Sequence, residues 1–137
     1  MSTRRSLELC AWCLLGVAVE VGLYLSYRAH DARFHWFTHF FVGASAALLV
    51  MSVVAARTHR PVRYPLIWAV LGHLVAMFPD FLFRTGIAHA RWMDVFLGHI
   101  TTHYVVGRNV TWYVVFLASL GLYLAVLARQ PATVSDG

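Results

Sequence analysis

The sequence predicts an all-α membrane protein, a bundle of four transmembrane helices with an additional amphipathic or re-entrant helix between spans three and four. Hydrophobic residues make up 60% of the chain and charged residues 12%, whereas a soluble domain carries about 25% charged residues. Four apolar stretches also approach the length of about 20 residues that a helix needs to cross a bilayer. They occupy most of the 137 residues, so we expect a single integral membrane domain over residues 1–137.

The first predicted span covers residues 9–27. Arg4 and Arg5 precede it, as in a signal peptide, but the apolar run continues too far and lacks a small-residue cleavage motif, so we expect a retained helix. Cys10 and Cys13 lie one turn apart inside this span. A C-x-x-C motif at a soluble strand–helix junction indicates redox chemistry, whereas we interpret these lipid-embedded thiols as small packing residues.

The second predicted span covers residues 36–56 and begins beside the motif His35-Trp-Phe-Thr-His39. One helical face carries His35, His39, Gly43 and Ala46. Small residues at such spacing favour close contact between membrane helices. We therefore expect this face, with both histidines, to point into the bundle.

The third predicted span covers residues 64–83, with His73 near its middle and Asp80 near its end. Seven residues are about two helical turns, so the two side chains share a face, and Pro79 should kink or loosen the helix beside Asp80. Glu20 lies in the first span at a depth similar to that of His73. Because ionisable groups inside a span face the interior and pair, we predict a Glu20–His73 contact, which either fixes helix register or supports the outer site as a proton relay.

Residues 84–109 form the longest predicted loop and carry charges throughout. Four of its residues recur at helical spacing: Trp92, Phe96, His99 and His103. This pattern predicts an interfacial helix at about residues 91–104. The fourth predicted span covers residues 110–128, and the polar tail at residues 129–137 is expected to be disordered.

Eleven basic residues, all arginine, give the chain a net charge of +5. They flank the predicted helices, where anionic lipid headgroups account for them, and no basic patch interleaved with exposed aromatics is present, so we exclude nucleic-acid binding. The short loop after the second span contains Arg57, Arg60 and Arg63. By the positive-inside rule, we expect this loop and both termini on the cytoplasmic side of the cell membrane.

Six of the eight histidines fall at the opposite, outer end of the predicted bundle: His30, His35, His39, His89, His99 and His103. Asp31, Asp80 and Asp94, half of the six acidic residues, lie in the same zone. Imidazole and carboxylate groups at one depth are the ingredients of a metal site or of acid–base chemistry. A histidine pair at i and i+4 can chelate one metal ion, although single histidines such as His30 are also common at membrane interfaces.

The order Thr38-His39-Phe-Phe-Val-Gly43, Phe78-Pro79-Asp80 and His99-Ile-Thr-Thr-His103 resembles the pattern of the bacterial inner-membrane-bound metal-dependent hydrolases. The resemblance covers about residues 35–105. It implies metal-dependent hydrolysis, with His39, Asp80, His99 and His103 as the metal or catalytic residues. The chain departs from the family at Leu82, where the family has a second aspartate, and in its late histidine pair, which is one residue closer.

The leading hypothesis is therefore a membrane-embedded metal-dependent hydrolase that acts on a lipid or a lipid-linked ester or phosphoester at the outer membrane interface. Zinc is the expected ion, because it needs only three protein ligands and lowers the pKa of a water molecule to about 7. The expected roles are metal binding for His39, Asp80, His99 and His103, catalysis for Asp94 and His35, and contact with an anionic headgroup for Arg84 and Arg91.

Two alternatives stay open at this stage. The chain could be a non-enzymatic membrane subunit or accessory protein whose histidines are structural or bind a metal or haem for assembly. It could also be an oxidative enzyme, although the H-x-x-H-H boxes of membrane di-iron enzymes are absent. The expected partners are membrane lipid and either further copies of the chain or a larger membrane complex.

Overall fold

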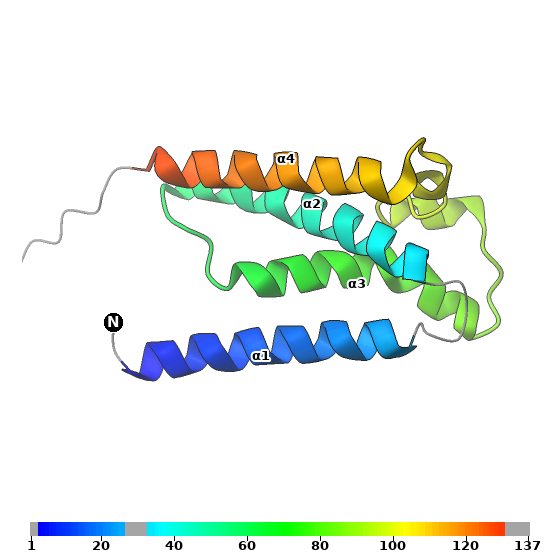
Figure 1. The fold of residues 1–137 in the computed structure, drawn as a ribbon, viewed down its shortest axis with the longest axis horizontal. Coiled ribbons are helices and arrows are strands. Elements are labelled where there is room, and N and C mark those ends of the chain that lie inside the picture. Colours follow the sequence, from blue (N-terminus) through cyan, green and yellow to red (C-terminus); the bar gives the residue numbers. More distant parts are fainter. Residues whose placement is uncertain (1–2, 27–32, 131–137) are drawn as a thin grey trace, which may run out of the picture.

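The computed structural model describes residues 3–26 and 33–130, with the backbone alone at residues 3, 26, 33–35 and 108. Secondary structure in these ranges is entirely helical. The four long helices are α1 (Thr3–Ser26), α2 (Arg33–Thr58), α3 (Pro65–Arg84) and α4 (Arg108–Ala128), and they run side by side (Figure 1). Each is long and apolar enough to cross a membrane, which confirms the predicted four-helix membrane bundle. His30, Asp31 and the predicted tail beyond Gln130 lie outside the described residues.

α2 is the central helix of the bundle. It packs against α3 and α4, whereas α1 packs against α3 (Figure 1). Buried apolar side chains therefore concentrate on α2, namely Val42, Ala44, Ala47, Leu48, Met51 and Ala55. α1 and α4 expose most of their apolar side chains, which is the pattern of helices that face lipid.

α2 and α3 cross at Gly43 and Gly72, where their backbones touch. A Cβ on Gly43 would lie 2.5 Å from the backbone nitrogen of His73, and a Cβ on Gly72 would lie 2.8 Å from the carbonyl carbon of Gly43. Only glycine allows two helices to approach this closely. The predicted close contact at Gly43 is thus confirmed. Because His39 lies one turn before Gly43 and Ala76 one turn after Gly72, the crossing sets the spacing of the helix ends beyond it.

The segment between α3 and α4 differs from the prediction. In place of one amphipathic helix at residues 91–104, the structure has two short 3-10 helices, η2 (Arg91–Val95) and η3 (Thr101–Tyr104). Leu97 and Gly98 lie between them with φ angles of 56° and 69°. These angles belong to the left-handed region, which a right-handed helix cannot contain. The helical spacing in this segment was therefore a misleading signal, because the chain turns at Leu97 and Gly98.

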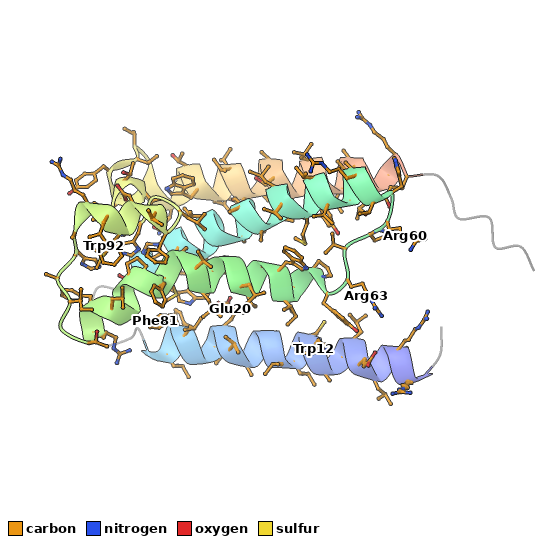
Figure 2. The ribbon with its side chains drawn as sticks, turned by 180° about the vertical axis from the view of Figure 1, so that it is seen from behind. Trp12, Glu20, Arg60, Arg63, Phe81 and Trp92 are labelled. Atoms are coloured by element: carbon orange, nitrogen blue, oxygen red, sulfur yellow. The ribbon has the colours of Figure 1, made fainter. Side chains whose placement is uncertain are left out.

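One buried polar contact ties α1 to α3. The carboxylate oxygens of Glu20 lie 2.8 and 3.0 Å from Nδ1 of His73, so the predicted contact is present, and Glu20 lies on the side of α1 that faces α3 (Figure 2). His73 is fully buried, and its ring stands edge-on to Trp36 and Phe40 of α2. The pair therefore fixes the register of α1 against α3 beside the α2–α3 crossing.

Glu20→Leu is expected to lower the free energy of unfolding by about 2 kcal/mol, because it leaves the buried Nδ1 of His73 without its partner. The double variant Glu20→Leu/His73→Leu should recover part of this loss, since two apolar groups replace the polar pair. Unfolding in detergent, followed by circular dichroism, measures both. A double variant as unstable as the sum of the two single variants would show that the side chains contribute independently.

Candidate metal centre

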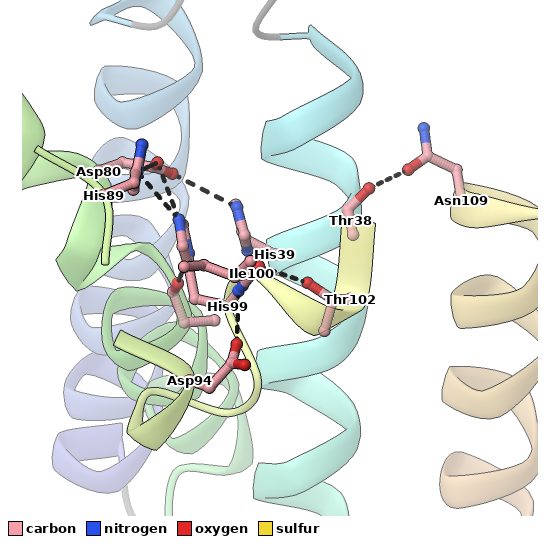
Figure 3. A network of polar contacts seen from close by, with 10 residues as sticks. Thr38, His39, Asp80, His89, Asp94, His99, Ile100, Thr102 and Asn109 are labelled. Atoms are coloured by element: carbon pink, nitrogen blue, oxygen red, sulfur yellow. Dashed lines mark hydrogen bonds and ion pairs between the residues drawn. The ribbon is translucent and has the colours of Figure 1, made fainter. Parts of the chain in front are cut away.

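A cluster of four histidines and one aspartate lies at the end of the bundle opposite Arg60 and Arg63 (Figures 2 and 3). Its members come from α2, the end of α3, the loop after α3, and the segment at η3: His39, Asp80, His89, His99 and His103. His39, Asp80 and His99 are buried, His103 is half-buried, and His89 is exposed. The structure thus brings together all four predicted metal ligands and adds His89 to them.

Three ligand atoms of the cluster form a nearly equilateral triangle. Nε2 of His99 lies 3.2 Å from Oδ1 of Asp80 and 3.3 Å from Nε2 of His89. Nε2 of His89 lies 3.4 Å from the same Oδ1. Two ligands of a tetrahedral zinc ion, each about 2.0–2.1 Å from the metal, are about 3.3 Å apart. The three edges therefore match one face of a tetrahedral coordination shell.

The backbone of α3 orients the ring of His99. Its Nδ1 lies 3.0 Å from the carbonyl oxygen of Ala76. A carbonyl can only accept, so Nδ1 carries the proton, and Nε2 of the neutral ring presents a lone pair to Asp80. Two acceptors at 3.2 Å repel each other unless a proton or a cation lies between them. Histidines that bind metals commonly donate their other N–H to a backbone carbonyl in this way.

His39 and His103 form the second half of the cluster. Nε2 of His39 lies 3.4 Å from Oδ2 of Asp80, and the His39 ring stacks on that of His99 with 4.4 Å between centroids. The ring of His103 is perpendicular to that of His39, at 5.1 Å. At this separation the two rings are too close to bind one haem iron from opposite faces.

Within the described residues, two overlapping groups of side chains could hold a metal ion. One group is His39, His99 and His103, the other is Asp80, His89 and His99, and the ligand atoms within each group lie within 4.8 Å of one another. The prediction that side chains are positioned to bind a metal ion is thus confirmed, whereas the identity of the metal stays a prediction. The thiols of Cys10 and Cys13 are free and lie on α1, outside both groups.

Asp94 lies beside the cluster, but its carboxylate is engaged by the loop (Figure 3). Oδ1 accepts hydrogen bonds from the backbone N–H groups of Ile100 and Thr101 at 2.7 and 2.9 Å, and Oδ2 accepts one from the Thr101 hydroxyl at 2.8 Å. The Thr101 N–H is the largest cause that lowers the pKa of Asp94 below its ordinary value of 3.8. A carboxylate so stabilised in its charged form is a weak base. We therefore interpret Asp94 as the residue that fixes the turn carrying His99, and its catalytic role stays a prediction.

Asp94→Ala is expected to loosen the turn and to weaken metal binding about 10-fold, because His99 loses its support. Asp94→Asn keeps one oxygen acceptor and should have a smaller effect. The stabilisation is fully present above the ordinary pKa of 3.8 and is lost as the pH falls through the lower pKa of the folded chain. Hydrogen exchange of the Thr101 amide at neutral pH measures the effect. Equal protection in wild type and Asp94→Ala would contradict the role assigned to Asp94.

The other predicted site residues are His35, Arg84 and Arg91. His35 belongs to α2, but its side chain lies outside the described residues. Arg84 ends α3 and Arg91 begins η2, and both are exposed, on either side of His89 in the chain. Close to His39, the Thr38 hydroxyl donates to the side-chain carbonyl of Asn109 (Figure 3), which joins the start of α2 to the start of α4.

No protein-family model, no curated protein and no solved structure matches this chain. A functional proposal therefore has to start from the donor atoms of the cluster and their position at the end of a membrane bundle.

Proposed function

We propose that the chain is a membrane-embedded metal-dependent hydrolase whose metal is held by Asp80, His89 and His99. The triangle of their ligand atoms, with edges of 3.2, 3.3 and 3.4 Å, is the observation that carries the proposal. Zinc suits two imidazoles and one carboxylate, and three protein ligands leave the fourth position open, as in catalytic rather than structural zinc sites. The resemblance to the bacterial inner-membrane-bound metal-dependent hydrolases supports the same reaction class, since Asp80 and His99 are among the residues that carry it.

A divalent cation in this site would act as a Lewis acid and would acidify a water molecule for attack on an ester or phosphoester. The remaining chemistry falls to the chain itself. Ala76 holds the ring of His99 in the orientation needed for Nε2 to face the ion. Nε2 of His39 faces Oδ2 of Asp80, and the ring of His103 contacts that of His39; with a single metal bound, these two histidines could accept or return a proton.

A lipid or lipid-linked substrate is supported by the surroundings of the cluster. The loop beside it exposes large apolar side chains at 52% in Trp92, 82% in Val95, 81% in Tyr104 and 90% in Val106. Aromatic and apolar groups at the end of a membrane bundle enter the headgroup region. Arg84 and Arg91 would hold an anionic headgroup there, because a guanidinium matches phosphate geometry. With Arg57, Arg60 and Arg63 near the other end, this end faces outward and both termini are cytoplasmic.

Elemental analysis and hydrolysis assays of detergent-purified protein test the proposal. Wild type should contain zinc and release product from lipid esters or phosphoesters, lose both after chelation, and regain both with added zinc. His99→Ala should lose both. His59→Asn is the matched control, because His59 is exposed in the loop after α2 and has a left-handed φ of 53° that asparagine tolerates. Metal without hydrolysis would favour an accessory subunit, and wild type that takes up no metal would overturn the proposal.

A further inference from the structure

The carboxylate of Asp80 divides its two oxygens between two sets of histidines. Oδ1 faces His89 and His99 at 3.4 and 3.2 Å, whereas Oδ2 faces His39 at 3.4 Å. We infer that the cluster holds two divalent cations bridged by this carboxylate, the first bound by His89 and His99 and the second by His39 and His103. The inference rests on the proposed metal site, although it does not require that the site hydrolyses anything.

The stacking of His39 on His99 is the main support for two ions. Their ring planes differ by only 8° and their centroids are 4.4 Å apart. An imidazole nitrogen binds a metal along a lone pair that lies in the ring plane, so two stacked parallel rings direct their lone pairs along separate planes. In the two-ion centre the rings therefore serve different ions, in place of the single ion that His39, His99 and His103 could hold. Two-metal hydrolytic sites separate their ions by about 3.5–4 Å.

His103 completes the ligand set of the second ion. Its ring is perpendicular to that of His39, with an interplanar angle of 85°, so the two lone pairs can converge on one point. The ligand atoms of His39 and His103 lie within 4.8 Å, against about 3.3 Å for neighbouring ligands of a tetrahedral ion. Binding of the second ion therefore draws His103 inward. Since the first set is already at coordination spacing, the first ion binds more tightly than the second.

The charge of such a centre narrows the substrate class. Two dications carry four positive charges, and Asp80 is the one carboxylate in either described group of ligands. Arg84 and Arg91 are exposed at the same end and add positive charge. An anionic group with two oxygens that can bridge the ions relieves this excess, and in two-metal sites a phosphoryl group does so. The two-ion site therefore selects a lipid phosphoester over an uncharged carboxylic ester.

Titration with Mn²⁺ tests the inference. The full-length protein is purified in detergent and stripped of metal by a chelator without being unfolded, and the two readouts are electron paramagnetic resonance and elemental analysis. Wild type should bind two Mn²⁺ per chain in a tight and a weaker step, and the second should convert the six-line signal of isolated Mn²⁺ into a broadened, exchange-coupled one. His103→Ala should bind one ion and keep the uncoupled signal. His89→Ala should lose the tight step. Inorganic phosphate should perturb the coupled signal of wild type.

The outcomes separate the two proposals. One Mn²⁺ per chain with an uncoupled signal at saturation overturns the two-ion inference and leaves the single-metal site intact, whereas no bound Mn²⁺ or Zn²⁺ overturns both. A coupled signal that phosphate leaves unchanged overturns the assignment to phosphoesters. His103 is half-buried, so its truncation is better tolerated than that of buried His39, and circular dichroism of each variant confirms that the bundle is folded.

Discussion

Asp80→Asn is expected to remove metal binding and hydrolysis together. Asp80 is buried, and its two oxygens face three histidines of the cluster. An asparagine keeps the shape of the side chain but removes the negative charge and presents an NH₂ group that cannot bind a cation. The affinity for zinc should therefore fall about 100-fold or more, beyond the loss typical of groups that only support a ligand. Competition with a chromophoric chelator measures the affinity.

Glu8→Gln provides the matched control, since Glu8 is an exposed carboxylate on α1 and the same change should leave zinc affinity unaltered. The metal-free Asp80→Asn protein should be at least as stable as metal-free wild type, because no buried carboxylate has to be desolvated. A variant that binds zinc as tightly as wild type would show that Asp80 is no ligand. A variant that fails to fold without metal would instead assign Asp80 a purely structural role.

Gly43→Ala is expected to destabilise the bundle and to weaken binding of the second metal ion, although Gly43 contributes no ligand. The new methyl group would lie 2.5 Å from the backbone nitrogen of His73, and a backbone cannot move aside as a side chain can. Overpacking costs about 1–3 kcal/mol and occasionally more, and we expect the upper end here. Separation of α2 from α3 also moves His39 away from Asp80. The midpoint of thermal unfolding and the zinc content measure the two effects.

The control for Gly43→Ala is Gly121→Ala in α4. A Cβ at Gly121 would have no atom within 4 Å, so this change should leave the cluster intact and raise stability by about 0.5–1 kcal/mol through helix propensity. Equal stability of the two variants would show that the α2–α3 crossing is looser than the glycine contact indicates.

The four spans could be predicted from the sequence because a bilayer permits few solutions for an apolar chain. The close contact at Gly43 and the Glu20–His73 pair followed from the same reasoning. Inside spans, small residues lie at contacts between helices, and ionisable groups face the bundle interior and pair. The loop could not be predicted in this way. The helix expected there is interrupted at Leu97 and Gly98, which adopt a left-handed conformation. The turn that they form is held by hydrogen bonds from the backbone of Ile100 and Thr101 to Asp94, and no repeating sequence pattern encodes such bonds.

Four of the five residues of the cluster could be predicted as ligands from the sequence, and the fifth, His89, was expected only to lie at the same end of the bundle. His39 and Asp80 were placed by their depth in helices, and His99 and His103 by their shared side of the membrane. His89 comes from an irregular loop without periodicity, and Ala76 contributes a backbone carbonyl that no side-chain pattern reveals. The catalytic role expected for Asp94 stays a prediction, and the hydrogen bonds from Ile100 and Thr101 to its carboxylate were not visible in the sequence.

X-ray absorption at the zinc edge of the zinc-loaded protein, wild type beside His99→Ala, identifies the atoms that bind the metal. We expect nitrogen and oxygen ligands at about 2.0–2.1 Å with imidazole scattering in wild type, and loss of that signal in His99→Ala. A first shell with sulfur at about 2.3 Å would place the metal at Cys10 and Cys13 instead. That result, or a zinc signal unchanged in His99→Ala, would contradict a metal centre built on Asp80, His89 and His99.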